Sequence, residues 1–343
     1  MPVDLRGGGP PITNTPPAVT LPGQDDQVAP ALPTLAVIVP ATDRPATLPQ
    51  CVEAIEPQLG HGDELIVVSE PPRSGPSAAR NRGAGQAKTD VLVFVDSDVV
   101  VHADALERVR SAFAEDPSLT AMFGSYDDGP RSRGLVSEFR NLLHHHVHHQ
   151  HPGSADTFWA GLGAVRRAEF LLLEGFDTTR FTRPSVEDID LGMRLRDLGG
   201  RIELRPSVQG THLKRWTLKS MVVTDFHRRG VPWTLMCLER QSWPGTLNLS
   251  WHERTSAVAM LAGLSGIALR RRGCARASAA AIVALNSGFY KLLIQRMGLL
   301  RGTLAIGLHA LHRLIGAAAL PSGALVYAYR QTRTPSASRV SNG

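Results

Sequence analysis

The sequence predicts an α/β protein built on a parallel sheet with helices on its faces. Residues 35–39, 64–68 and 91–95 are short apolar runs with the length and composition of buried strands. Apolar residues at helical spacing over 48–59, and a second helical stretch over 78–87, separate these runs. Strands and helices that alternate in this order are typical of right-handed βαβ units. Ligands of such sheets bind at the carboxyl ends of the strands, so we expect the chemistry just after each run.

Length and composition favour one large α/β domain with an accessory region, because the chain has 343 residues of which 43% are apolar. Its three cysteines, Cys51, Cys237 and Cys274, are odd in number and form no CxxC pair, which indicates reduced thiols in a cytosolic compartment. Residues 1–33 are rich in Pro and Gly and lack the pattern of a signal peptide. We expect them to be a disordered lead-in.

Charge is divided unequally along the chain. No Asp or Glu follows Glu253, whereas residues 254–343 hold 12 Lys or Arg. Residues 1–253 therefore carry 25 basic against 31 acidic side chains, a net charge of −6 in a chain whose total is +6. A basic, apolar C-terminal third is attracted to anionic lipid headgroups while its apolar faces enter the acyl boundary. Because its arginines are spread among apolar runs, we expect no nucleic acid partner.

The apolar stretches of this C-terminal third are short or interrupted. Residues 256–269 give 14 apolar-leaning positions before Arg270, fewer than the roughly 20 needed to cross a bilayer. Residues 314–329 form another short run, which contains Pro321. The pattern predicts interfacial or re-entrant helices. The alternative is a soluble helical subdomain packed on the sheet, which explains the apolar faces but not the missing acids.

Two carboxylates follow the third predicted strand, in Asp96-Ser97-Asp98. They converge only if the strand breaks into a turn there, and the carboxyl end of a strand permits one. Their chemical use is to hold a hard divalent cation, Mg²⁺ or Mn²⁺, which bridges phosphate oxygens. A solvated turn produces the same motif without any function. The preceding strand VLVFV and the βαβ start favour the metal interpretation.

A second acidic pair, Glu187-Asp188, opens a predicted amphipathic helix over 189–198 with leucines on one face. Carboxylates at a helix start are favourable through capping and the helix dipole alone. That explanation accounts for one carboxylate and does not require two. The functional interpretation makes Asp188 a general base whose position is fixed by the helix start.

Three ordered blocks of the chain resemble family 2 glycosyltransferases of the GT-A fold, of the membrane-associated bacterial type, across roughly residues 34–220. VIVPATDRPATLPQCVEAI is similar to the family's opening strand, turn and first helix. GPSAARNRGAGQAKTDVLVFVDSD is similar to its Ala-Arg-Asn-x-Gly helix and DxD strand. GLGAVRRAEFLLLEGFDTTRFTRPSVEDIDLGMRLRDLGGRI is similar to its acceptor-side block, with a Gly-Phe-Asp turn and the Glu-Asp pair. The resemblance implies a GT-A fold: a nucleotide-diphospho-sugar transferase with a Rossmann-like, mostly parallel sheet, followed here by a C-terminal helical membrane-associated region.

The resemblance also implies a site for a UDP- or GDP-linked sugar. Asp43 stands where the family has Asn, and Glu70 substitutes for an Asp that contacts the base, so the choice between uridine and guanosine stays open. The implied site residues are Pro40, Asp43, Arg44, Glu70, Arg80, Asn81 and Asp96 for the donor, Asp96, Asp98 and His212 for the metal, and Gly161, Gly163, Glu187, Arg215 and Trp216 on the acceptor side.

The family mechanism is a single displacement that inverts the anomeric centre. A metal on Asp96 and Asp98 neutralises the diphosphate leaving group as charge builds on it. Asp188 deprotonates an acceptor hydroxyl, which attacks the anomeric carbon from the opposite face through an oxocarbenium-like transition state.

Histidines occur at two further places. His212, in GTHLKRWTL, lies where similar enzymes often have a His that contacts metal or phosphate, and a strand-edge histidine is the alternative. The segment resembles the Gln-x-x-Arg-Trp motif of processive synthases with His in place of Gln, so we do not expect processive synthesis. The His-rich run 144–151 has histidines at i and i+4, as in zinc-binding helices. Because no Cys or Glu accompanies them, we interpret the run as a solvated helix near the acceptor.

The sequence therefore predicts a lead-in over 1–33, a GT-A catalytic domain over 34–250, a helical membrane-associated region over 251–330 and a disordered tail over 331–343. The predicted function is transfer of a sugar to a hydroxyl or phosphate of a lipid-linked or glycan acceptor, at an anionic membrane surface on the cytoplasmic face of the cell membrane. A sugar-1-phosphate nucleotidyltransferase would need a GxGxR loop where this chain has PATDRP. A non-catalytic sugar-nucleotide-binding or scaffold protein would tolerate loss of one carboxylate motif, whereas both are intact here.

Overall fold

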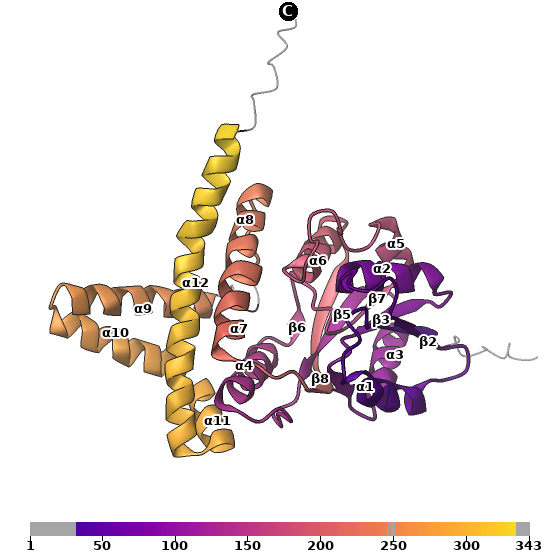
Figure 1. Cartoon of the computed structure of the whole chain (residues 1–343), viewed down its shortest axis with the longest axis horizontal. Helices are drawn as coiled ribbons and strands as arrows, with labels where there is room; N and C mark the ends of the chain where they lie inside the picture. The colour runs from indigo at the N-terminus through magenta and orange to yellow at the C-terminus, as the bar shows by residue number, and fades with distance from the viewer. Residues whose placement is uncertain (1–31, 246, 248–250, 334–343) are drawn as a thin grey trace, which may run out of the picture. The chain divides into compact units, whose positions relative to one another are not determined.

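The computed structural model describes residues 32–245, 247 and 251–333. The predicted lead-in over 1–33 and tail over 331–343 lie outside this part, apart from two and three residues respectively. One sheet organises the described residues (Figure 1). Its strands are β1 (Leu35–Pro40), β2 (Glu64–Val68), β3 (Val91–Val95), β4 (Val99–Val101), β5 (Leu119–Tyr126), β6 (Gly153–Ser154), β7 (Leu162–Arg166) and β8 (Arg201–His212).

The first three strands lie where the apolar runs predict them. β1 pairs in parallel with β2 on one side and with β3 on the other, so that Val37 lies opposite both Leu65 and Val93. The strand order of the main path is β2-β1-β3-β7-β5-β8-β4, and β6 pairs with β8. The predicted βαβ start is confirmed.

Beyond β3 the sheet is mixed, which corrects the expectation of a mostly parallel sheet. β7 runs antiparallel to both β3 and β5, and β4 and β6 run antiparallel to β8; β5 and β8 are parallel. The chain returns next to β3 in the opposite direction, with Val95 opposite Leu162. This reversal brings the segment before β7 to the edge where β3 ends.

Helices cover both faces of the sheet (Figure 1). One apolar core joins the sheet to α1 and α3, and the other joins it to α2, α4, α5 and α6. The predicted helix over 189–198 is confirmed as α6, and it begins at Glu187. The bounds are α1 (Leu48–Ile55), the 3₁₀ turn η1 (Glu56–Gln58), α2 (Pro76–Gln86), α3 (Ala105–Glu115), α4 (Leu135–Gln150), α5 (Arg167–Leu172) and α6 (Glu187–Asp197).

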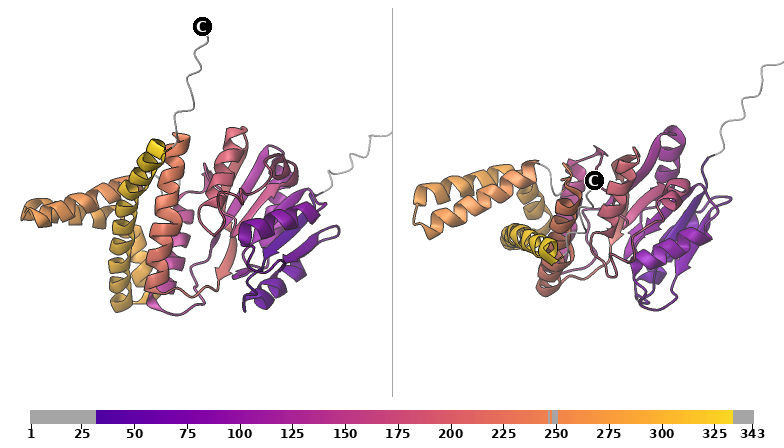
Figure 2. Two further views of the ribbon diagram at one scale, coloured as in Figure 1. Left: turned by 45° about the horizontal axis from the view of Figure 1, so that its top comes forward. Right: turned by 90° about the horizontal axis from the view of Figure 1, so that it is seen from above.

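The described chain after β8 consists of helices joined by short non-helical segments. The long C-terminal helix α12 packs along η2, α8 and α9 and also contacts α4; Figure 2 shows it (yellow) alongside α8. α9 and α10 are antiparallel neighbours, with Gly263 beside Ser278 and Gly266 beside Ala275. The bounds are α7 (Leu218–Val223), the π-helical turn η2 (Thr224–Gly230), α8 (Val231–Arg240), α9 (Trp251–Ala268), α10 (Arg272–Leu285), α11 (Ser287–Met297) and α12 (Leu299–Arg333).

The expectation that no apolar stretch is long enough to cross a bilayer is wrong for α12. This helix has 35 residues, and within the described ranges it is the one continuous helix long and apolar enough to span a membrane; its length is about 52 Å at 1.5 Å per residue. Arg313 does not break the apolar run, because its guanidinium is buried and paired with Glu253. Pro321 lies inside the helix without ending it. α10 and α11 pass the same test together, but a 68° bend separates them.

The C-terminal helices are attached to the sheet domain through α4. Phe139 of α4 contacts Phe289 of α11, with ring centroids 6.1 Å apart. Arg301 of α12 donates to the buried carboxylate of Glu138 at 2.8 Å. One apolar core thus continues from the sheet through α4 into α11 and α12.

Helix α6 fits closely against the segment that leads into β7. A Cβ atom on Gly192 would lie 2.3 Å from the backbone nitrogen of Phe158, so only glycine allows this approach. Because Gly192 is in α6, this close packing also determines where Asp188, at the start of the helix, lies.

We predict that Gly192→Ala displaces α6 and destabilises the protein by about 1–3 kcal/mol, the usual cost of overpacking. Gly85→Ala in α2 is the matched control, since nothing lies within 4 Å of its added Cβ. The control should unfold at the wild-type denaturant concentration or slightly above it. Chemical unfolding of both variants measures the difference, and equal midpoints would contradict the close-packing argument.

Candidate functional site

A cavity of about 1110 Å³ opens where the carboxyl ends of β1 and β3 meet the start of α6 and the end of β8. This is the edge of the sheet at which the sequence predicts the chemistry. Ten of the predicted site residues line the cavity: Pro40, Asp43, Arg80, Asp96, Asp98, Gly161, Glu187, Asp188, His212 and Trp216.

A buried guanidinium joins the two acidic motifs. Arg80 of α2 donates to Asp96 at 2.5 Å and lies 3.9 Å from Glu187, and its side chain is only 5% exposed. The guanidinium also lies over the ring of Phe176, 5.5 Å from the centroid. A buried charge of this kind is tolerable only when it is paired. Arg80 therefore fixes the end of β3 and the start of α6 relative to each other.

The strand does break into a turn at Asp96-Ser97-Asp98, as the motif requires. The amide of Val99 donates to the Asp96 carbonyl at 2.9 Å, and the amide of Leu213 donates to the Asp98 carbonyl at 2.8 Å. The second bond ties the turn to the end of β8, where His212 is the last residue. Asp98 and His212 come together there, with 3.7 Å between Oδ2 and Nε2.

Asp98 and His212 fit a divalent cation. Burial alone would raise the pKa of Asp98, but the imidazole of His212 and the charge of Lys214 outweigh it and lower the pKa, so the carboxylate is ionised. Within the described ranges no group of three or more His, Cys, Asp or Glu side chains is arranged to hold a metal. The Asp98 carboxylate suits a Mg²⁺ or Mn²⁺ ion that takes most of its other ligands from phosphates and water, and a nitrogen ligand such as His212 suits the transition metal Mn²⁺ better than Mg²⁺.

His212 is oriented by an aromatic stack that the sequence analysis missed. The ring of Tyr126, at the end of β5, lies parallel to His212 with 4.2 Å between centroids and 9° between planes. Tyr126 in turn contacts Trp159 at 4.9 Å and His144 at 4.3 Å. Only the three-dimensional arrangement brings these rings together, because they come from β5, β8, α4 and the segment before β7.

Asp188 lies in the first turn of α6 and faces the cavity. Its Oδ1 accepts from the Ile189 amide at 2.9 Å, and its Oδ2 lies 3.5 Å from the Ala160 amide. Burial, with a smaller contribution from the charge of Glu187, raises the pKa of Asp188 to about 6. A carboxyl with such a pKa accepts a proton near neutral pH, as a general base must.

Glu187, the other member of the pair, has a structural role. Its side chain is buried, accepts from the Ser185 amide at 2.6 Å and lies close to Arg80. The pair therefore divides into a carboxylate that holds the helix start and one that is available to a substrate.

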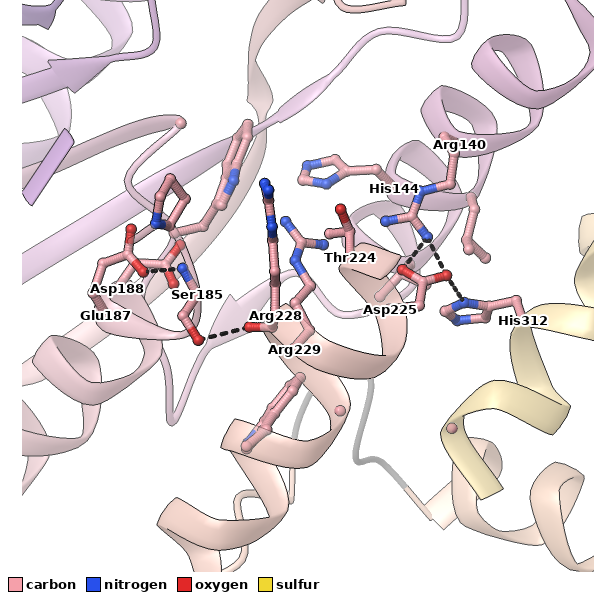
Figure 3. A pocket seen from close by; sticks show the side chains of 18 of the residues that line it. Arg140, His144, Ser185, Glu187, Asp188, Thr224, Asp225, Arg228, Arg229 and His312 are labelled. Carbon is pink, nitrogen blue, oxygen red and sulfur yellow. Dashed lines mark hydrogen bonds and ion pairs between the residues drawn. The ribbon is translucent and has the colours of Figure 1, made fainter. Parts of the chain in front are cut away.

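The opposite wall of the cavity is basic (Figure 3). Arg140 of α4 and His312 of α12 both donate to Asp225 of η2, at 3.0 Å and 2.8 Å. Arg228 and Arg229 stand between this cluster and the Asp188 side. The sequence analysis named none of these five residues, because three lie in η2 and the other two in α4 and α12, and no local motif connects these helices.

The interpretation of the His-rich run as a solvated helix is wrong for its inner face. His148 is buried and donates from Nδ1 to the Gly124 carbonyl at 2.8 Å, and burial lowers its pKa to about 3. His144 packs between His148 and Trp159, with ring centroids 3.8 and 4.4 Å away. Burial also lowers the pKa of His144 well below its usual value. These rings are neutral packing elements of the cavity wall.

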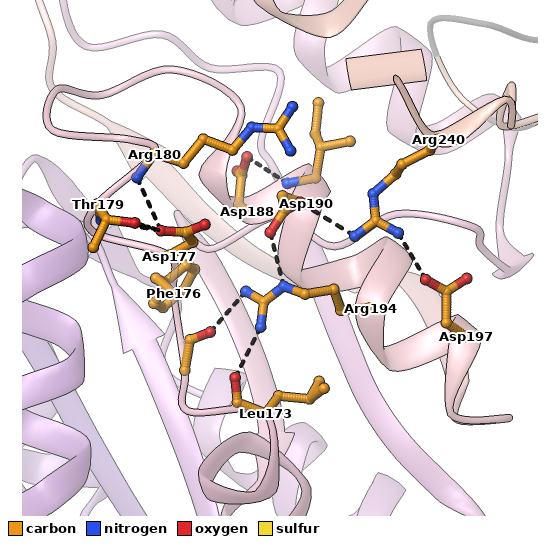
Figure 4. Close-up of polar contacts among 12 residues, drawn as sticks. Leu173, Phe176, Asp177, Thr179, Arg180, Asp188, Asp190, Arg194, Asp197 and Arg240 are labelled. Carbon is orange, nitrogen blue, oxygen red and sulfur yellow. Dashed lines mark hydrogen bonds and ion pairs between the residues drawn. The ribbon is translucent and has the colours of Figure 1, made fainter. Parts of the chain in front are cut away.

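A polar network holds α6 in place (Figure 4). Asp190 accepts from Arg194 at 2.8 Å and from Arg240 of α8 at 3.3 Å. Arg194 also donates to the carbonyls of Leu173 and Gly175, at 2.9 and 2.7 Å. The predicted Gly-Phe-Asp turn is thereby attached to the helix that carries Asp188.

Five predicted site residues lie outside the cavity. Arg44 and Glu70 form an exposed ion pair with 3.3 Å between them, on the side of β2. Asn81 donates to the carbonyl of Phe176 at 2.8 Å and accepts from its amide at 2.9 Å, which supports the Gly-Phe-Asp turn. The remaining two are Gly163, which packs within β7, and Arg215, which is exposed after β8.

Residues 62–170 match the family model for glycosyl transferase family 2. This match supports the family resemblance over that segment of the chain. The chain is 28% identical over 176 residues to the pre-mycofactocin glycosyltransferases of two Mycobacterium tuberculosis strains, CDC 1551 / Oshkosh and ATCC 25618 / H37Rv. The alignment covers 48% of this chain and 35% of those proteins, so the chain matches about a third of the length of these relatives.

The GT-A fold of this chain is confirmed by its similarity to a solved structure. The mannosyltransferase PcManGT from Pyrobaculum calidifontis, in complex with GDP-Man and Mn²⁺, matches with a TM-score of 0.50 at 17% identity. The match covers 88% of this chain and 89% of that one. It therefore includes C-terminal helices as well as the sheet.

We predict that kcat/KM for sugar transfer falls about tenfold per pH unit below pH 6. The pKa of Asp188 is raised to about 6, so the carboxylate that accepts a proton is lost as the pH falls through that value. Initial rates over pH 4.5–8.5 at saturating metal measure the profile. Asp188→Asn is the control, since its residual rate should lack this acid limb. A flat wild-type profile down to pH 4.5 would assign the base elsewhere.

Proposed function

We propose that this protein is a metal-dependent, inverting glycosyltransferase that transfers a sugar from a nucleotide-diphosphate donor to a membrane-proximal acceptor. One observation carries the proposal: the Asp98–His212 pair and the Asp188 carboxylate face the same cavity. The family match supports the reaction class. The GDP-Man and Mn²⁺ in the structural relative support a nucleotide-sugar donor and a divalent cation.

Asp98 and His212 would hold Mg²⁺ or Mn²⁺, and when bound the ion neutralises the diphosphate of the donor. We assign the nucleotide-sugar, UDP- or GDP-linked, to the side of the cavity lined by Pro40, Asp43 and Asp96. Arg80 occupies one carboxylate oxygen of Asp96. We therefore place Asp96 in donor binding and the cation on Asp98.

Asp188 acts on the acceptor. Its carboxylate takes the proton of the acceptor hydroxyl, whose oxygen forms a bond to the anomeric carbon. The bond from that carbon to the diphosphate oxygen breaks, and the nucleoside diphosphate leaves with the electron pair. Attack from the face opposite the leaving group inverts the centre. The raised pKa of Asp188 suits this role, because it makes the carboxylate a stronger base than an ordinary aspartate while most of it stays ionised at neutral pH.

The chain after Glu253, which contains no acidic residue, supports a place at a membrane. We propose a catalytic domain over 34–250 and a membrane-associated helical region from 251 onward, on the cytoplasmic face. α12 has the length and composition of a membrane helix, and the 12 basic residues after Glu253 suit an anionic surface.

We predict that Asp98→Asn abolishes metal-dependent donor binding and transfer while leaving the fold intact. The substitution keeps the shape of the side chain and removes the charge that holds the cation. Calorimetric titration of UDP and GDP, with Mn²⁺ and with EDTA, measures binding. If wild-type affinity does not respond to EDTA, the metal assignment is wrong.

We predict that Asp188→Asn retains donor affinity and lowers kcat by at least about 10², the lower end of general-base effects. Asn still accepts a hydrogen bond at a helix start, so the change separates the structural role from the catalytic one. Product formation and donor titration on the same preparation give the two values. Near-wild-type turnover would leave Asp188 with only a structural role.

A further inference from the structure

The cavity continues beyond Asp188 toward the C-terminal helices. α9 and α12 line this end with polar residues first, Glu253, Arg254, His312 and Arg313, and then with small or apolar ones further along each helix: Ala257, Val258, Leu261, Gly316, Ala317 and Leu320. Val258 is 65% exposed, Leu261 49% and Leu320 51%. An open apolar strip joined to a catalytic cavity is a site for an apolar chain.

Two arginines mark the boundary between the polar and apolar parts. Arg228 and Arg229 are exposed to the cavity, and for the described part of the chain neither guanidinium has an ion pair or hydrogen bond. The backbone carbonyl of Arg228 accepts from Ser185 at 2.6 Å, which holds this turn beside the start of α6. Figure 3 shows both side chains between Asp188 and Asp225.

The nearest carboxylates act on this pair only at a distance. The charge of Arg229 affects Asp225 and Asp188 without a direct ion pair, Asp225 is already shared by Arg140 and His312, and Glu187 lies against Arg80. Two adjacent guanidiniums whose donors have no bonded partner form a strong site for a phosphate, which they bind by charge-assisted hydrogen bonds. The donor diphosphate is assigned to the other side, where Asp98, His212 and Lys214 lie.

We propose that the acceptor is a membrane lipid that carries a phosphate between its hydroxyl-bearing headgroup and its apolar chain. This inference rests on the proposed function. The hydroxyl lies at Asp188, the phosphate binds Arg228 and Arg229, and the chain lies along α9 and α12. The volume of about 1110 Å³ exceeds the usual range for one small ligand, which leaves room for donor and acceptor together.

The geometry also gives the lipid a path. α12, the helix with the composition of a membrane segment, lines the apolar end of the cavity with Gly316, Ala317 and Leu320. A lipid in the adjacent leaflet therefore meets the apolar strip before it meets the arginines. The phosphate takes no part in the reaction. Its binding to the two arginines sets how far the acceptor hydroxyl enters the cavity toward Asp188.

Binding of three probes to the full-length protein tests the proposal. Dodecyl phosphate carries chain and phosphate, dodecyl β-D-glucoside carries the chain alone, and glycerol 3-phosphate carries the phosphate alone. Each is titrated below its critical micelle concentration and followed by tryptophan fluorescence, because Trp233 and Trp243 line the cavity. We expect dodecyl phosphate to bind at least tenfold more tightly than either other probe.

The variants separate the two parts of the site. Arg228→Gln/Arg229→Gln should remove the tenfold advantage of dodecyl phosphate over the glucoside. Val258→Ser/Leu261→Ser should remove its advantage over glycerol 3-phosphate. Arg272→Gln/Arg276→Gln on α10 is the matched charge control, outside the cavity lining, and should bind all probes as wild type does. Circular dichroism checks that each variant is folded.

Several outcomes would overturn the proposal. Equal affinity for dodecyl phosphate and the glucoside would show that the site does not recognise a phosphate. Equal affinity for dodecyl phosphate and glycerol 3-phosphate would indicate a soluble phosphate compound as the acceptor. Loss of UDP or GDP affinity in the arginine variant would assign the pair to the donor. Failure of the proposed function is separate, because it would show as metal-independent or absent nucleotide binding in the wild type.

Discussion

The site depends on one buried guanidinium, that of Arg80. Arg80 has only 5% of its side chain exposed and holds Asp96 at the end of β3 and Glu187 at the start of α6. Without both carboxylates Arg80 would be an uncompensated buried charge, which is far more costly than the paired arrangement. Since Asp98 and Asp188 each lie next to one of these carboxylates, the same guanidinium sets the relative positions of the proposed cation site and the proposed base.

The two acidic motifs therefore divide their work in the same way. All four carboxylates line the cavity, but in each motif one of them contacts Arg80 and the other does not. Desolvation raises the pKa of Asp188, whereas the imidazole of His212 and the charge of Lys214 keep the pKa of Asp98 low despite its burial. Two carboxyl groups in one cavity thus have opposite tendencies, one to hold a cation and one to accept a proton.

Local patterns predicted the elements that local forces determine. The apolar runs gave β1, β2 and β3, and the Glu-Asp pair marked the start of α6, because strand burial and helix starts leave a signal within a few residues. The antiparallel entry of β7, the stack of Tyr126 on His212 and the arginines of η2 left no such signal, since each depends on contacts between distant segments. α12 was divided at Arg313 in the prediction because the sequence does not show its partner, Glu253.

The π-helical turn η2 holds one carboxylate and two guanidiniums close together in the chain. Asp225 pairs with Arg140 of α4 and with His312 of α12, so three elements that are distant in the sequence meet at one side chain. Arg228 and Arg229 follow Asp225 in the same turn and line the cavity, and the charge of Arg229 also acts on the Asp225 carboxylate. A movement of α12 that displaced His312 would therefore change the charge balance of this turn, which couples the C-terminal helices to the interior of the cavity.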